Sequence, residues 1–171
     1  SNFATAMTWY TYSVNTPLPD AAVVLEAIRN SIADETGLDD LAFSETHVIL
    51  SLTRQLALGN LAQWVAEDEA RAADATDIQV ASAKRKIDLL NRKRVDLINQ
   101  LHEKFAKASA AHEGELPTSF VSPADVVDRL SVLFIRERTL RRAAALSPLD
   151  TSLQVSLTDC QSDLIHESNH L

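Results

Sequence analysis

The residues that interrupt helices most constrain what this chain can fold into. It has only three glycines and five prolines, and seven of these eight residues fall between stretches of helical pattern or in the first turn of one. The intervals between them show no sustained alternation of apolar and polar residues, which a half-buried strand would require. The sequence therefore predicts an all-α protein.

Start and stop signals divide the chain into an arm and five helices. Pro17 and Pro19 close an irregular N-terminal arm, residues 1–19, and Ser122-Pro123 combines a capping residue with a proline at the first helical position. Ser147-Pro148 repeats this signal and predicts the start of the fifth helix. The connections between the long helices are short, which favours antiparallel neighbours. We therefore expect a single up-and-down antiparallel bundle of four to five helices over residues 20–171, with helices at about 20–36, 44–72, 76–110, 123–146 and from 147 towards the C-terminus.

Charge and cysteine content limit the partners and the compartment. The formal net charge of -8 disfavours nonspecific binding to nucleic acids and to anionic membranes, because both attract proteins with a basic excess. No apolar run approaches the ~20 residues that span a bilayer. The only cysteine, Cys160, cannot form an intrachain disulfide and is expected to be a buried, inert thiol. These features favour a reducing, cytoplasmic location.

Polar residues interrupt the apolar stripes of the second and third expected helices. Arg94 projects near the middle of such a stripe, and the turn at Asp74 folds the two helices back on each other. Burying an unpaired charge lowers the stability of a fold by several kcal/mol, so this guanidinium must pair with a carboxylate, reach solvent or bind a ligand. The antiparallel pairing predicts an inter-helix cluster, within reach of Glu137 on the fourth helix, that comprises Asn60, Glu67, Arg71, Asp88, Asn91 and Arg94.

Two interpretations of this cluster remain open. In the first, it forms a pocket for an anionic or hydroxyl-rich small molecule, with Arg71 and Arg94 as anion partners and Glu67 or Asp88 as a general base. The predicted ligand-binding residues are Asn60, Trp64, Glu67, Arg71, Asp88, Asn91, Arg94 and Asp128. In the second, the cluster only fixes helix register in a structural or interaction protein, whose apolar arm packs on a partner or on a second copy in a homo-oligomer.

The sequence gives no indication of a metal site or a cofactor. A di-metal helical bundle needs two Glu-x-x-His motifs, and the chain has one, Glu167 to His170. The other histidines share no zinc-ligand spacing. We therefore expect neither a metal nor a cofactor.

Three blocks of sequence resemble a bacterial all-helical family described only as a domain of unknown function, of the DUF4254 type. They are Asn60–Arg71, Lys84–Asp96 and Ser122–Leu133, and the resemblance extends over about residues 20–165. It implies the helical fold and the polar cluster, and it carries no established reaction. The resulting hypothesis is a bacterial small-molecule-binding bundle, an accessory enzyme of glycoconjugate or specialised metabolism, with the structural or interaction protein as the alternative.

Overall fold

The described part of the chain forms five α-helices, as the sequence predicts. The computed structural model describes residues 19–33, 45–110 and 121–171, so the predicted arm lies outside the described residues except for Pro19. Over these three ranges the chain contains no strand, which confirms the all-α class. None of the helices described is both long and apolar enough to cross a membrane. The helices are α1 (Ala21–Ala33), α2 (Glu45–Arg71), α3 (Asp77–Ala110), α4 (Pro123–Leu146) and α5 (Thr151–Ser168).

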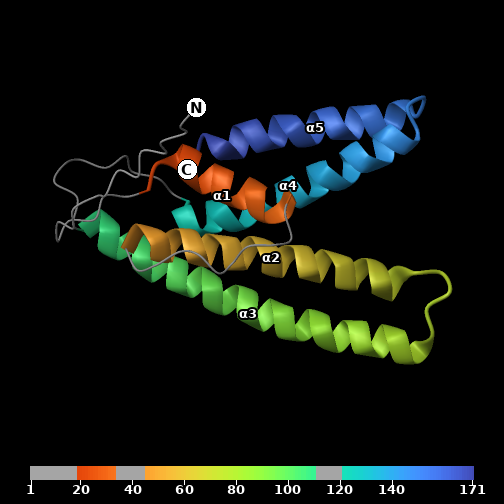
Figure 1. Ribbon diagram of the computed structural model, residues 1–171, viewed down its shortest axis with the longest axis horizontal. Helices are drawn as coiled ribbons and strands as arrows, with labels where there is room; N and C mark the ends of the chain where they lie inside the picture. The colour runs from red at the N-terminus through yellow and green to blue at the C-terminus, as the bar shows by residue number, and fades with distance from the viewer. Residues whose placement is uncertain (1–18, 34–44, 111–120) are drawn as a thin grey trace, which may run out of the picture.

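The helices form two antiparallel hairpins with α1 packed between them. Helices α2 and α3 make one hairpin, α4 and α5 make the other, and the turns of both lie at the same end of the molecule (Figure 1). Helix α4 is the central element, because it packs against each of the other four helices. Side chains on its different faces therefore meet different neighbours.

The hydrophobic core lies towards the end of the molecule that contains α1. All five helices contribute to it, from Val24 and Ile28 on α1 to Leu164 on α5. Burying an aliphatic side chain of this size stabilises a fold by about 1.5–3 kcal/mol. On α3 the large buried side chains are Leu97, Leu101 and Phe105, all in the second half of the helix. Arg94 comes one helical turn before this buried stretch, so it lies at the edge of the core.

Two of the predicted helix starts have the expected caps. Ser122 Oγ accepts a hydrogen bond from Ala124 N at 3.2 Å, with Pro123 in the first turn of α4. At the start of α3, Thr76 Oγ1 accepts from Gln79 N at 3.4 Å, and Gln79 Oε1 accepts from Thr76 N at 2.8 Å. This reciprocal arrangement is a capping box.

The prediction that Ser147-Pro148 begins the fifth helix is wrong. Ser147 instead ends α4, where its N–H donates to Ala143 O at 3.0 Å. Asp150 caps α5, and its Oδ1 accepts from Ser152 N at 2.9 Å and from Leu153 N at 3.3 Å. A carboxylate at a helix N-terminus also interacts favourably with the helix dipole, which gives Asp150 an advantage that a serine hydroxyl lacks.

Candidate functional site

A buried polar cluster joins α2, α3 and α4. Arg94 on α3 donates two hydrogen bonds to Asp128 on α4, from Nε to Oδ1 at 2.9 Å and from Nη2 to Oδ2 at 2.5 Å. Asn60 on α2 donates through Nδ2 to Asp128 Oδ1 at 3.0 Å and to Ser131 Oγ at 2.5 Å. Ser131 in turn donates to the Asp128 carbonyl at 2.8 Å. The cluster therefore links three helices through one carboxylate.

Burial makes this carboxylate dependent on its partners. The Asp128 side chain is 10% exposed and the Arg94 side chain is 33% exposed. Both oxygens of Asp128 accept hydrogen bonds, which offsets the cost of removing the charge from water. In return, the hydrogen bond with Asp128 raises the pKa of the Arg94 guanidinium, with smaller contributions from the charges of Asp128 and Glu67, while partial burial opposes the shift. Arg94 is consequently a fixed cation at the junction of the three helices.

A pocket of about 380 Å³ opens beside Arg94, between α3, α4 and α5. We call it the Arg94 pocket. On its α4 and α5 walls, Arg129 donates through Nε to Glu167 Oε1 at 2.7 Å, and its Nη2 forms an ion pair with the same oxygen at 2.5 Å. The Glu167 side chain is only 14% exposed. The pocket is lined by Arg94, Arg129, Val132, Leu133, Asp163, His166 and Glu167.

The lining of the Arg94 pocket combines hydrogen-bond donors with acceptors. Two guanidinium groups supply donors, two carboxylates supply acceptors, and the imidazole of His166 can do either. Such a surface can bind several polar groups of one small molecule. Among the described residues, no group of three or more His, Cys, Asp or Glu side chains lies close enough together to hold a metal ion.

The structure brings together three of the eight predicted ligand-binding residues, Asn60, Arg94 and Asp128. Trp64, also predicted, packs half-buried against the hydrophobic core. Glu67 accepts from Arg71 Nη2 at 2.7 Å in an ion pair between neighbouring turns of α2.

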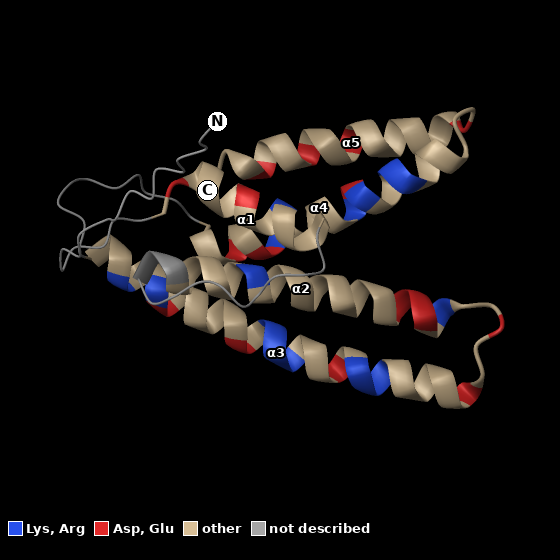
Figure 2. Ribbon diagram, viewed as in Figure 1, with Lys and Arg blue, Asp and Glu red and all other residues tan. Residues whose placement is uncertain are grey.

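The other predicted residues are exposed to solvent on the hairpin formed by α2 and α3. The Arg71 side chain is 69% exposed, and Asp88 and Asn91 are exposed on α3. Figure 2 shows the acidic and basic residues that end α2 next to the turn. None of these three residues, nor Glu67, lines the Arg94 pocket. The candidate general bases Glu67 and Asp88 are therefore outside it.

Four polar lining residues were not predicted as site residues from the sequence, namely Arg129, Asp163, His166 and Glu167. His166 and Glu167 follow Asp163 by three and four residues, which places all three on one face of α5. That spacing was the available signal. These three residues lie on the fifth helix, on which no site residue was predicted.

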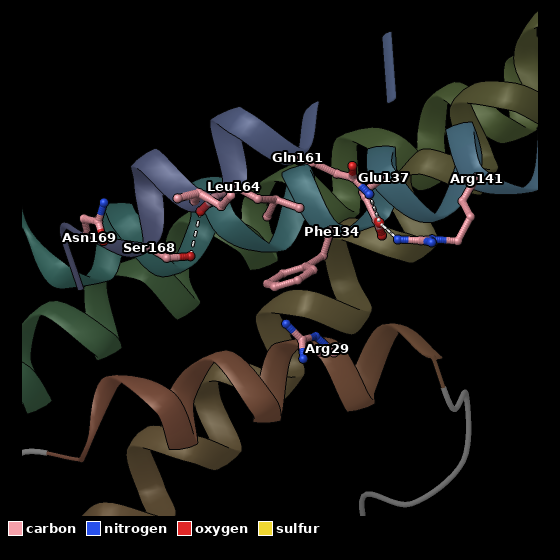
Figure 3. Close-up of a pocket in the computed structure, with 9 residues that line it drawn as sticks. Arg29, Phe134, Glu137, Arg141, Gln161, Leu164, Ser168 and Asn169 are labelled. Carbon is pink, nitrogen blue, oxygen red and sulfur yellow. Dashed lines mark hydrogen bonds and ion pairs between the residues drawn. The ribbon is translucent and has the colours of Figure 1, made fainter. Parts of the chain in front are cut away.

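Glu137 does not reach the Arg94 cluster as the sequence suggested. It lines a second and larger groove of about 700 Å³ between α1, α4 and α5 (Figure 3). There it accepts hydrogen bonds from Arg141 Nη2 and from Gln161 Nε2, the latter at 3.4 Å. The helical repeat explains this position, because Glu137 follows Asp128 by nine residues and therefore lies on the opposite face of α4 from it, about 180° around the helix.

Together the fold and the pocket define a class of protein: an all-α chain of two hairpins with a polar pocket between helices. The chain belongs to the family described as "Protein of unknown function (DUF4254)", whose model matches residues 50–168. The matched segment contains every residue that lines the Arg94 pocket, as well as Asn60 and Asp128. The family resemblance drawn from the sequence is thus confirmed. No curated protein and no solved structure matches the chain.

Proposed function

We propose that this protein binds a hydroxyl-rich small molecule with a single anionic group in the Arg94 pocket. The observation that carries the proposal is the position of Arg94, which lines the pocket while Asp128 holds its Nε and Nη2. A guanidinium fixed in this way loses little further freedom when a ligand binds, which favours affinity. The volume of about 380 Å³ also lies within the usual range for small-molecule sites.

The charges around the pocket narrow the class of ligand. The lining contains the guanidinium groups of Arg94 and Arg129 and the carboxylates of Asp163 and Glu167, so it does not carry a cationic excess. A molecule with several negative charges would be repelled by these two carboxylates. Hydroxyl groups both donate and accept hydrogen bonds, so they match the alternation of guanidinium and carboxylate groups. A single carboxylate on the ligand would bind the guanidinium side.

The closed hydrogen bonding of Asp128 favours a second candidate function. Both carboxylate oxygens already have partners from this chain, so the cluster is complete without a ligand. On this alternative the cluster only sets the register of three helices, and the protein acts as a structural or interaction module. The two functions differ in whether the adjoining pocket is used.

Ligand-induced thermal stabilisation tests the proposal. We expect glucuronate, which carries one carboxylate and several hydroxyls, to raise the melting temperature more than glucose or citrate does, because only glucuronate matches both parts of the lining. A ligand at 100 times its Kd stabilises the folded state by about 2.7 kcal/mol. His166→Gln and Arg94→Lys should reduce the shift, since each changes a pocket donor.

Arg85→Met is the matched control, because Arg85 is exposed on α3 and does not line the pocket. This variant should keep the full shift. The proposal is wrong if glucuronate gives no shift, or if His166→Gln and Arg94→Lys retain the shift of the unchanged protein. Either result would leave the structural function as the better account.

A further inference from the structure

We infer that the groove between α1, α4 and α5 is a second binding site, for an aromatic carboxylate. This goes beyond the proposed function, because none of the described residues lines both the groove and the Arg94 pocket. On α5 the two sets of residues also lie on opposite faces, at about 100° of rotation per residue. We call this second site the Arg29 groove, after the residue that α1 contributes to it (Figure 3).

Arg29 is the cation that makes the groove selective for an anion. Within the described part of the chain, no carboxylate lies within ion-pair distance of its guanidinium. Its Cζ lies 5.4 Å from the centroid of the Phe134 ring, an attractive cation–π arrangement. Figure 3 shows Arg29 reaching from α1 towards this ring on α4. The outer N–H groups of a guanidinium are well suited to hold a carboxylate by two parallel hydrogen bonds.

The opposite wall of the groove does not supply a competing charge. Among the described residues of the lining, Glu137 is the only acidic one, and its side chain is 17% exposed. It forms an ion pair with Arg141 and accepts from Gln161. Arg141 thus neutralises the Glu137 carboxylate within the same wall. The charge of Arg29 then gives the groove a net positive charge.

The apolar part of the lining favours a flat ring on the ligand. Phe134 and Leu164 are both 9% exposed, and Ile165, which is 68% exposed, extends this surface outwards. An aromatic ring buries more surface against such side chains than a short aliphatic acid does, and it can adopt an edge or offset geometry with Phe134. With the carboxylate at Arg29, the amide of Asn169 remains in the lining for a polar substituent.

Calorimetric titration of the full chain tests this inference with four probes. 4-Hydroxybenzoate should bind, and 4-hydroxybenzamide should bind at least about tenfold more weakly because it cannot form the charged pair with Arg29. Cyclohexanecarboxylate and acetate should also be weaker, since one lacks the flat ring and the other lacks the apolar body. Arg29→Gln should lower the affinity for 4-hydroxybenzoate by about tenfold or more.

Two controls separate this site from the Arg94 pocket and from general charge effects. Arg94→Lys and Arg85→Gln should both bind 4-hydroxybenzoate as the unchanged protein does, because neither residue lines the Arg29 groove. Arg29 is exposed, so its replacement is not expected to prevent folding. Equal affinity for the acid and the amide, unchanged affinity in Arg29→Gln, or no binding at millimolar 4-hydroxybenzoate would each overturn the inference. Because Arg29→Gln leaves the Arg94 pocket intact, each site can fail without the other.

Discussion

The pair formed by Arg94 and Asp128 should be strongly coupled in stability. Each residue is the main partner of the other, through two hydrogen bonds of 2.9 and 2.5 Å. We consider a double-mutant cycle that consists of Arg94→Met, Asp128→Ala and the combined variant. Methionine keeps much of the arginine's packing volume without its charge, so the cycle isolates the electrostatic part of the interaction.

The two single changes should have unequal costs. Arg94→Met leaves the Asp128 carboxylate, 10% exposed, with only Asn60 as a side-chain donor to it, and an uncompensated buried charge of this kind costs about 3–5 kcal/mol. Asp128→Ala leaves Arg94, whose side chain is 33% exposed and can turn towards water, so we expect a loss of about 1.5–3 kcal/mol. In the combined variant neither charged group is left without its partner. It should therefore be more stable than the sum of the two losses implies, by about 2–3 kcal/mol.

Urea unfolding followed by far-UV circular dichroism measures all four free energies of unfolding. The exposed pair Glu67 and Arg71 provides a matched cycle, for which a coupling of about 0.5 kcal/mol or less is expected. The reasoning is refuted if the losses at Arg94 and Asp128 add to within about 0.5 kcal/mol. It is equally refuted if their coupling is no larger than that of the exposed pair.

Three further predictions concern caps and buried groups elsewhere in the chain. The Ser152 side chain and the backbone N–H groups of residues 152 and 153 lower the pKa of the Asp150 carboxyl, so Asp150→Ala should lower the melting temperature at neutral pH whereas Ser147→Ala should not. The stability that Asp150 contributes is present above its ordinary pKa and is lost as the pH falls through the lowered value, so acid should abolish the difference between Asp150→Ala and the unchanged protein. Thr53 Oγ1 is buried without a hydrogen-bond partner among the described residues. Thr53→Val should therefore leave the free energy of unfolding, measured in urea, unchanged or raise it by about 1–2 kcal/mol. A decrease of similar size would show that the hydroxyl is paired. Burial raises the pKa of the Cys160 thiol, so iodoacetamide should modify it in urea but not in the folded protein, and rapid alkylation without urea would contradict this.

The fold was predictable because its determinants are local. Thr76 and Ser122 cap their helices through groups no more than three residues away, so the signal is complete within a short window of sequence. The start of α5 shows the limit of this reasoning. Ser147 and Asp150 are both good capping residues, and the choice between them depends on where the preceding helix ends, because the Ser147 N–H is already used by α4.

The candidate site was only partly predictable because it depends on where α4 packs against the hairpin of α2 and α3. Folding α2 against α3 correctly brings Asn60 and Arg94 towards one region, but Asp128 on α4 decides which part of the hairpin is buried. Beyond that contact, towards the turn, Arg71 and Asp88 remain exposed. The periodicity of two helices cannot specify where a third one crosses them, and this crossing point is what separates the assembled residues from the exposed ones.

The structural role of Arg94 and the ligand-binding role that we propose for it are compatible, and this affects how variants should be interpreted. The ion pair that fixes three helices also holds the guanidinium at the pocket wall, so any change at Asp128 alters both stability and the pocket. Loss of ligand binding in an Asp128 variant would therefore not distinguish the two roles. His166 can distinguish them, because it lines the pocket, is exposed, and takes no part in the hydrogen bonds of the buried cluster. A His166→Gln variant with unchanged stability and reduced glucuronate binding would show that the pocket has a function beyond holding the helices together.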